Sequence, residues 1–392
     1  ASYRRQRQMC IRDRYISLLF AFIQLNAQSG IISGFISDSS SAEALIGANV
    51  ILQETGQGMA TDINGYYIIQ DITPGNYVLM VSYVGFKLKK EKLKISDGQS
   101  IKLDISLSED VVELTQIEVT AEQIQRKSNI QPSKINLSPR MMKAAPALAE
   151  PDLFRTIQAL PGVLTTSEFS TGLVIRGGNT DQNLILLDGV TVYNPSHLGG
   201  IFSNFIVDGV KEAELIKGAY NAEYGGRLSA VLNIISREGN QKKFEGKANL
   251  SLLSAQATIE GPFYKGAWVF SGRRTYFDKI FQNVPTIPPY YFYDIQSHIY
   301  TDLTSKDRLS LSFYNGVDDL LFDTFGLTGR WGNRTVSAQY RRVFSEKLIG
   351  NFLYANSLFF TEFGLGGSNG LVSDNQIDDA TVAANFSWFK SS

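Results

Sequence analysis

Apolar and polar side chains alternate with a period of two between residues 241 and 392, and this alternation constrains the fold more than any other feature. From residue 244 to residue 252, Phe, Gly, Ala and Leu occupy the even positions, whereas Glu, Lys, Asn and Ser occupy the odd ones. The pattern recurs over 293–303, 308–313 and 381–388. Strands with one apolar and one polar face are typical of a membrane β-barrel wall, but a soluble β-sandwich shows the same alternation. The pattern alone therefore predicts antiparallel strands and leaves both structures open.

The composition excludes several classes of protein. The chain has 37 Lys plus Arg and 38 Asp plus Glu, a net charge of -1, so no charge excess favours nucleic-acid binding. A single cysteine, Cys10, excludes an intrachain disulfide and a cysteine-based metal site. The two histidines, His197 and His298, are far apart in sequence, which argues against a zinc site or a Ser-His-Asp triad. We therefore predict that the chain is not an enzyme and has no catalytic residue, metal or cofactor. Because no run of about 20 apolar residues occurs, we also predict no membrane-spanning helix.

Residues 1–27 are predicted to be an export signal peptide. An arginine-rich stretch over 1–14 precedes an apolar run over 15–25, which has the length of a secretory hydrophobic region. Leu25, Asn26 and Ala27 form an acceptable cleavage site before Gln28. A buried core helix is the alternative. The chain opens with Ala, and the basic stretch is longer than an export signal needs, so we expect that the first few residues are not the natural start.

Residues 28–108 are predicted to form a small antiparallel β-sandwich, because short apolar runs are separated by Gly, Pro, Asn and Asp. The runs cover 31–36, 48–52, 66–69, 77–84, 88–95 and 101–107. The segment resembles the carboxypeptidase-regulatory-like domain, a transthyretin-like sandwich. The resemblance lies in Gly34-Phe-Ile-Ser-Asp38, Gly47-Ala-Asn-Val50, Thr61-Asp-Ile-Asn-Gly-Tyr66, Pro74-Gly-Asn-Tyr77 and Val84-Gly-Phe86. It implies no peptidase activity, and such a domain often precedes the plug of bacterial outer-membrane receptors.

Residues 109–125 are predicted to be a linker that binds an energy-transducing partner. Apolar and polar residues alternate through Ile117, Glu118, Val119, Thr120 and Ala121. An extended segment of this kind can add a strand to the sheet edge of a partner. The segment resembles a TonB box, which implies a TonB-type inner-membrane transducer as partner. An ordinary linker or a first plug strand is the alternative.

Residues 126–240 carry five motifs in a fixed order. They are Leu160-Pro-Gly-Val163, Ile175-Arg-Gly-Gly178, Leu187-Asp-Gly-Val190, Tyr224-Gly-Gly-Arg227 and Leu232-Asn-Ile-Ile-Ser236. Together they resemble the plug domain of a TonB-dependent outer-membrane receptor, an α/β domain, in which we also expect a short helix over 150–162. A sixth run, 212–218, ends in Lys217-Gly218, where many members of the family carry Arg-Gly. The motif residues are Arg176, Gly177, Gly178, Asp188, Gly189, Lys217, Gly218, Tyr224, Gly225, Gly226 and Arg227.

Two groups of plug residues are candidates for function. Arg176, Lys217 and Arg227 could pair with carboxylates of the barrel wall and hold the plug, although each could instead bond only within the plug. Asp188 before Gly189 is expected to be a turn residue rather than a ligand group. Family resemblance implies that two loops face the substrate, although a lone loop histidine is more often solvated. The loop candidates are Tyr193, Asn194, His197, Thr165 and Glu168.

Residues 241–392 are too few for a complete plugged barrel. They supply roughly seven or eight strands, whereas plugged transporters have about 22. Since open edges are not tolerated in a bilayer, we expect the N-terminal part of a longer barrel. In this interpretation, His298 faces the lumen and residues 364–375 lie in an extracellular loop.

The resemblance implies active import of a scarce nutrient across the bacterial outer membrane, with the sandwich in the periplasm. The ligand classes it allows are siderophores, cobalamin, oligosaccharides and peptides. The implied partners are the TonB-type transducer, the lipid bilayer, a nutrient ligand and a surface lipoprotein. Three alternatives remain: a ligand-sensing signal transducer, a secreted enzyme and a non-functional fragment.

Overall fold

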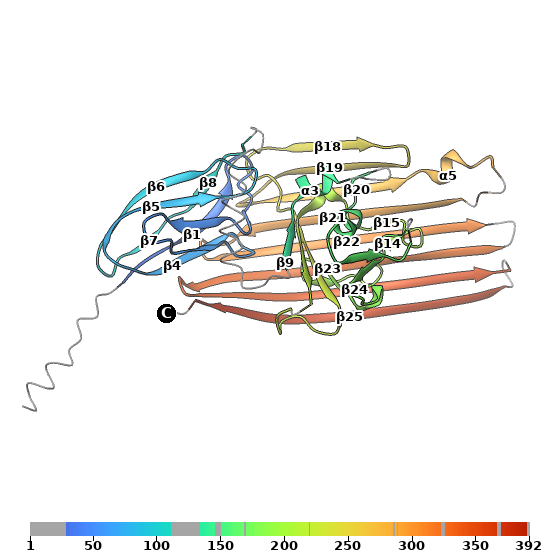
Figure 1. The fold of residues 1–392 in the computed structure, drawn as a ribbon. Helices are drawn as coiled ribbons and strands as arrows, with labels where there is room; N and C mark the ends of the chain where they lie inside the picture. The colour runs from blue at the N-terminus through green and yellow to red at the C-terminus, as the bar shows by residue number, and fades with distance from the viewer. Residues whose placement is uncertain are drawn as a thin grey trace, which may run out of the picture.

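The computed structural model describes residues 29–110, 134–145, 150–167, 170–218, 220–284, 287, 289–322, 326–366 and 370–389. These residues form a β-sandwich, a mixed plug and one long antiparallel sheet (Figure 1). This confirms the predicted fold class: a mainly β chain with a sandwich, an α/β plug and the first strands of a barrel wall. The predicted signal peptide at 1–27 and the TonB-box candidate at 117–121 lie outside the described residues.

The sandwich packs two four-stranded sheets around an apolar core. Its strands are β1 (Gly30–Asp38), β2 (Asn49–Leu52), β3 (Gly58–Ala60), β4 (Tyr66–Ile72), β5 (Gly75–Ser82), β6 (Lys89–Ile95), β7 (Ser100–Lys102) and β8 (Ile105–Leu107). One sheet contains β4, β1, β7 and β8, and the other has the order β3-β2-β5-β6. Tyr67, Leu79 and Val81 are fully buried between the two sheets. Alternate residues of these strands point into this core, which is why short alternating runs fold as a sandwich.

The plug is built on a five-stranded sheet with the order β13-β12-β17-β16-β9. Its strands are β9 (Lys134–Leu137), β10 (Val163–Thr165), β11 (Leu173–Ile175), β12 (Leu184–Leu187), β13 (Val190–Thr191), β14 (Ser196–His197), β15 (Phe202–Ser203), β16 (Val210–Lys217) and β17 (Ala230–Ser236). Its helices are α3 (Pro139–Ala144), α4 (Leu153–Gln158) and the 3-10 turns η1 (Thr180–Gln182) and η2 (Val207–Gly209). The core of the plug lies between the two helices and this sheet.

The plug helix is shorter than the sequence predicted. Residues 150–162 were expected to be helical, but α4 covers only Leu153–Gln158. Asp152 accepts hydrogen bonds from the backbone N–H groups of Phe154 and Arg155, at 2.8 and 3.1 Å, and so begins the helix after Pro151. This start leaves Glu150 outside the helix.

The third part is an eight-stranded sheet in which every strand pairs with its neighbours in sequence. Its elements are β18 (Glu245–Leu250), β19 (Ser254–Phe263), β20 (Gly266–Thr275), α5 (Phe277–Ile280), β21 (Tyr290–Asp302), β22 (Asp307–Phe322), β23 (Leu327–Ser345), β24 (Leu348–Leu365) and β25 (Leu371–Trp388). Within the described residues, β18 and β25 each have one neighbour, so this sheet is open.

The two faces of this sheet differ as the alternation predicted. One face carries exposed apolar side chains such as Leu311, Val382 and Phe386, as expected of a wall that faces lipid. The opposite face is polar and contacts the plug, and His298 lies on it and bonds to Ser312 at 2.8 Å. We call this polar face the lumenal face.

No helix among the described residues is both long and apolar enough to cross a lipid bilayer.

The last two strands extend further than expected. Residues 364–375 were predicted to be a loop, but Leu365 pairs with Leu371 and Thr361 pairs with Asn375. The prediction was wrong because Ser373, Asp374 and Asn375 lack the apolar alternation of a lipid-facing strand, although their backbones still pair. The short hairpins between β19 and β20, β21 and β22, and β23 and β24 lie at the end of the sheet where the sandwich sits (Figure 1).

Candidate functional site

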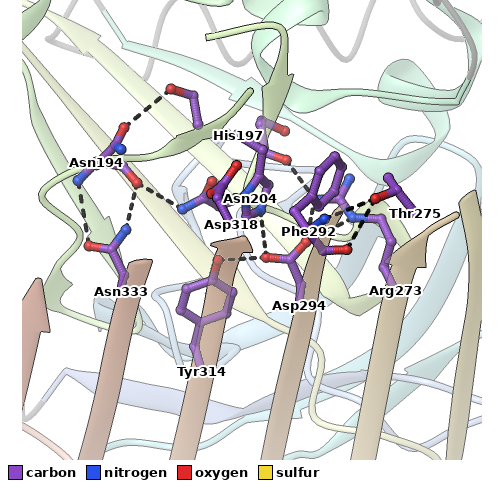
Figure 2. Close-up of polar contacts among 12 residues, drawn as sticks. Asn194, His197, Asn204, Arg273, Thr275, Phe292, Asp294, Tyr314, Asp318 and Asn333 are labelled. Carbon is purple, nitrogen blue, oxygen red and sulfur yellow. Dashed lines mark hydrogen bonds and ion pairs between the residues drawn. The ribbon is translucent and has the colours of Figure 1, made fainter. Parts of the chain in front are cut away.

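The plug lies against the lumenal face of the sheet, and buried charges meet there (Figure 2). His197 and Glu150 come from the plug, whereas Arg273, Asp294 and Asp318 come from β20, β21 and β22. We call these five residues the plug–sheet ionic cluster. Each of the ion pairs within the cluster joins side chains that are at most 3% exposed.

The loop after β14 directs His197 toward the sheet. Strands β14 and β15 pair through Ser196 with Ser203 and His197 with Phe202. Between them, Leu198, Gly199 and Gly200 have φ angles of 49°, 63° and 106°. Two glycines adopt this left-handed backbone without steric cost, so the loop reverses within a few residues. The reversal leaves His197 buried at 1% exposure.

His197 is held between two carboxylates. Its Nδ1 lies 2.7 Å from Oδ2 of Asp318 and its Nε2 lies 2.8 Å from Oδ1 of Asp294. Its ring stacks on Phe292, with centroids 4.1 Å apart and planes inclined by 6°. Both ring nitrogens donate hydrogen bonds only when the imidazole is protonated, so this geometry favours the charged form. Burial opposes that charge, but Asp294 and Asp318 outweigh it and raise the pKa of His197 to about 9.

Arg273 connects the remaining members of the cluster. Its Nε and Nη2 donate to Oδ2 of Asp294 at 2.9 and 2.6 Å, which is a bidentate contact. Its Nη1 donates to Glu150 at 2.6 Å, and its Nη2 also donates to the carbonyl of Ser203. Three carboxylates therefore face two cations. With the carboxylates ionised, the cluster carries one net negative charge when His197 is protonated and two when it is neutral.

Two tyrosines satisfy the remaining carboxylate oxygens. Tyr314 donates to Oδ1 of Asp294 at 2.7 Å, and Tyr290 donates to Oδ1 of Asp318. The backbone N–H of Leu198 also donates to Oδ1 of Asp318, at 3.0 Å. Removal of His197 would leave Asp318 without its cation in the cluster, and removal of Arg273 would leave Glu150 without its cation, which is costly in a protein interior. The plug–sheet ionic cluster therefore holds the plug against the wall.

Further hydrogen bonds join the plug to the lumenal face on either side of the cluster. They link Asn333 to the carbonyl of Asn194, Gln339 to the carbonyl of Asp188, Ser357 to the carbonyl of Thr191, Tyr193 to Asp379 and Arg237 to Glu260. Within the described residues, no three His, Cys, Asp or Glu side chains are arranged to hold a metal ion.

The cationic motif residues lie away from this cluster. Nζ of Lys217 donates to the carbonyl of Pro161 at 2.7 Å, and Nη1 of Arg227 donates to the carbonyl of Gly226. Arg176 lies in the turn after β11 with a φ of 48°. These hydrogen bonds of Lys217 and Arg227 are thus within the plug, and pairing of Arg176, Lys217 and Arg227 with barrel carboxylates stays a prediction.

The remaining motif residues lie mainly in turns. Asp188 and Gly189 form the turn between β12 and β13, with φ angles of 52° and 81°, and Asp188 accepts hydrogen bonds from Ser236. Tyr224 packs against Leu186, Ile216 and Val231. The other motif glycines with left-handed backbones are Gly177, Gly218 and Gly226.

The substrate-loop candidates have different environments. Asn194 lines a cavity of about 450 Å³ together with Leu198, Tyr290, Trp331 and Phe363. Tyr193 donates to Asp379 at 2.9 Å. Thr165 ends β10, and Glu168 lies outside the described residues.

His197 is buried, whereas a lone loop histidine is more often solvated. Its two carboxylate partners come from strands about a hundred residues later in the chain, which no local pattern reveals. The alternation over 293–303 assigns Asp294 to a polar face and indicates no partner for it. A substrate contact for any loop candidate stays a prediction.

The described chain thus combines a sandwich, a mixed plug and an open sheet whose polar face contacts the plug. Two family models match the chain: the CarboxypepD_reg-like domain over residues 32–119 and the TonB-dependent receptor plug domain over residues 137–231. The chain therefore carries a carboxypeptidase-regulatory-like domain followed by the plug domain of a TonB-dependent receptor.

Known relatives agree with this assignment. The chain is 30% identical over 250 residues to the TonB-dependent receptor P26 of Formosa agariphila, which covers 59% of this chain and 23% of that protein. It is 24% identical over 229 residues to the TonB-dependent transporter Oar of Myxococcus xanthus, covering 55% of this chain and 21% of that protein. These relatives are receptors and transporters, in agreement with the prediction that the chain is not an enzyme.

Among solved structures, the ferric enterobactin receptor of Pseudomonas aeruginosa matches 66% of this chain and 47% of that chain, with 19% identity and a TM-score of 0.48. The chain thus spans less than half of that receptor and less than a quarter of the two sequence relatives.

Proposed function

We propose that the protein imports a nutrient across the bacterial outer membrane and that a TonB-type inner-membrane transducer supplies the energy. The observation that supports this most is the plug–sheet ionic cluster, which holds a plug of the TonB-dependent receptor type against the lumenal face. A channel closed in this way needs an external input to open, because the buried charges separate only when the plug moves.

The position of the predicted TonB box favours mechanical coupling. Residues 117–121 precede β9 in the chain, and within the described residues β9 is an edge strand that pairs with β16 alone. The ion pair between Lys134 and Glu214 and the burial of Leu137 add to this pairing. A pull on residues 117–121 therefore reaches the described part of the plug first at the edge strand β9, and from there acts on β16.

The energy transducer is proposed to bind by strand addition. Ile117, Val119 and Ala121 would face one side of an added strand, and Glu118 and Thr120 the other. Backbone hydrogen bonds would supply most of the affinity, so the segment needs free N–H groups more than particular side chains. In this proposal the sandwich lies in the periplasm, and the ligand class stays open among siderophores, cobalamin, oligosaccharides and peptides, with a surface lipoprotein as a further partner.

The test is binding of the full-length receptor to the periplasmic domain of its TonB-type transducer. Val119→Pro removes both the valine side chain and the backbone N–H, whereas Val119→Ala shortens the side chain and keeps the N–H. We expect the proline variant to lose binding at least tenfold and the alanine variant to retain most of it. Wild-type binding by Val119→Pro would exclude this segment as the coupling site. A reporter of ligand-dependent transcription that responds to the receptor in the absence of import would favour a signal transducer instead.

A further inference from the structure

Strand β4 of the sandwich is apolar on both faces, and each face is buried against a different part of the molecule. Tyr67 and Ile69 point into the sandwich core and are 0% and 4% exposed. Tyr66 and Ile68, which alternate with them, are 3% and 5% exposed and pack against Ile349 of the large sheet. A strand at the surface of an isolated sandwich would have one solvated face. The second buried face therefore belongs to a contact with the barrel wall.

This contact, which we call the sandwich–rim contact, lies at the hairpin between β23 and β24 and at the end of β25. The Tyr66 ring lies 5.2 Å from the ring of Phe35 and 6.0 Å from the ring of Phe389. The Arg341 guanidinium lies 5.1 Å from the Phe35 ring centroid. An apolar cluster edged by a cation–π pair thus joins β1 and β4 to the rim of the sheet.

Hydrogen bonds at the same rim fix the orientation of the sandwich. The Tyr66 hydroxyl donates to the carbonyl of Glu346 at 2.8 Å, and the Ser100 hydroxyl donates to the Glu346 carboxylate at 2.6 Å. Nε2 of Gln70 donates to the carbonyl of Phe389 at 3.2 Å. Side chains from β4 and β7 therefore attach to two neighbouring points of the rim.

The sandwich is also attached at the opposite edge of the large sheet. The backbone N–H of Gln241, just before β18, donates to the carbonyl of Ser41 at 2.9 Å. The Glu43 carboxylate accepts from the backbone N–H of Glu238 at 2.8 Å and lies 3.6 Å from Arg237. Since β18 and β25 are the two edges of the sheet, the sandwich extends across its end (Figure 1).

We propose that the sandwich closes this end of the lumen and must separate from the rim, as a folded unit, before a substrate can leave the receptor. The proposal rests on the proposed import function. Tension on residues 117–121 acts on both neighbours of that segment: the plug at Lys134 and the sandwich at Asp110. The same pull that moves the plug therefore also acts on the sandwich–rim contact.

The sizes of the two apolar clusters favour separation over unfolding. The sandwich core contains 15 buried residues, whereas the cluster at the sandwich–rim contact contains 3. Because apolar burial is the main stabilising contribution, the smaller contact should open first under load.

Ile68 and Ile69 provide a matched pair of probes on neighbouring positions of β4. In a Cys10→Ser background, Ile68→Cys places a thiol in the sandwich–rim contact, and Ile69→Cys places one in the sandwich core. Cells that contain the full-length receptor and its transducer are treated with a membrane-impermeant maleimide after permeabilisation of the outer membrane. We expect labelling of Cys at position 68 to rise several-fold in energised cells over uncoupled cells, while position 69 stays protected.

Two results would overturn the proposal: equal labelling at position 68 with and without energy, or a parallel rise at both positions. The last would mean that the sandwich unfolds. Two cross-linked variants control for structural damage caused by the buried substitution at position 68. Ser100→Cys with Glu346→Cys, joined by a short bis-maleimide, should abolish the rise at position 68. Ser37→Cys with Ser106→Cys, within the sandwich, should not.

The binding test of Val119→Pro separates this proposal from the import function. If the transducer binds residues 117–121 but position 68 stays protected, only closure by the sandwich is wrong. If the transducer does not bind this segment, the proposed energy coupling itself is wrong.

Discussion

Nε2 of His197 lies 2.8 Å from Oδ1 of Asp294, so a plug loop and a strand of the barrel wall share a buried charged contact. The same carboxylate accepts from Arg273 of the neighbouring strand. Asp294 therefore contacts one cation of the plug and one of the wall. A change at His197 tests this attachment without altering the wall.

His197→Ala should weaken the attachment of the plug substantially. The substitution leaves Asp294 and Asp318 short of one cation in a site that excludes water, and removal of one partner from such a site costs about 3–5 kcal/mol. We expect a fall of this size in the free energy of unfolding of the plug, measured by denaturant titration of the full-length receptor in detergent. His298→Ala is the matched control, because His298 bonds to Ser312 rather than to a carboxylate. Equal effects of the two substitutions would show that the plug–sheet ionic cluster is not what attaches the plug.

The attachment should also depend on pH. The pKa of His197 is raised to about 9 in the folded protein, above its ordinary value of about 6.5. Its contribution to stability is therefore fully present below about pH 6.5 and is lost as the pH rises through about 9. The groups that face it are Asp294, Asp318, Arg273, Glu150, Tyr290 and Tyr314.

Unfolding of the plug measured between about pH 7 and about pH 10 checks this dependence. His197→Gln keeps a hydrogen-bond donor and cannot gain a charge, so the difference between wild type and this variant isolates the histidine. We expect that difference to shrink as the pH rises. A difference that is constant over the range would mean that His197 is neutral in the folded receptor.

The sequence predicted the plug and the barrel wall, but not which side chains of the two contact each other. Alternation assigned Asp294 and His298 to the polar face of β21, and the structure places both on the lumenal face. The alternation could not pair Asp294 with His197, because they are 97 positions apart and the intervening residues include the end of the plug and three strands of the wall. Long-range pairing depends on strand register and on how the plug is seated, which a local period does not encode.

The sequence likewise indicated only part of the environment of β4, which is buried on both faces. Residues 66–69 form a continuous apolar run, which is compatible with a strand buried on both faces. The run does not reveal that one of these faces meets a sheet some 280 positions later in the chain, as the bond between Tyr66 and Glu346 shows. In the same way, the polar residues 373–375 did not predict a strand, although they form one, because backbone pairing does not require apolar side chains.

Two motif glycines should differ sharply in their tolerance of alanine. A Cβ on Gly178 would lie 2.4 Å from Oγ and 2.5 Å from Cβ of Ser229, whereas a Cβ on Gly225 meets no atom within 4 Å. Ser229 cannot retreat freely, because its hydroxyl donates to the carbonyl of Ile175 at 2.8 Å. Gly178→Ala should therefore destabilise the plug by about 1–3 kcal/mol through overpacking.

Thermal unfolding of the plug in the full-length receptor distinguishes the two glycines. Gly225→Ala should leave the unfolding temperature close to that of the wild type, and Gly178→Ala should lower it by several degrees. If Gly225→Ala lowers the temperature as much, the close approach at Ser229 is not what requires glycine. Loss of import by Gly225→Ala at full stability would instead indicate a direct role for this motif in function.

Asp188 is expected to stabilise the plug through two contacts with Ser236. Its Oδ1 accepts from the backbone N–H at 2.8 Å and its Oδ2 from the hydroxyl at 2.6 Å, which connects the turn after β12 to the end of β17. Asp188 also has a left-handed backbone, with a φ of 52°, which Asn and Asp adopt more readily than Ala. Asp188→Ala loses both contacts and strains the turn, so we expect a loss of about 2–3 kcal/mol in the stability of the plug. Asp188→Asn keeps an acceptor and the backbone preference and should lose less than half as much.

Denaturant titration of both Asp188 variants is the measurement, with Ser236→Ala as the control that removes only the hydroxyl contact. Equal losses for Asp188→Asn and Asp188→Ala would mean that the negative charge, rather than the geometry of the turn, is what the plug requires at this position.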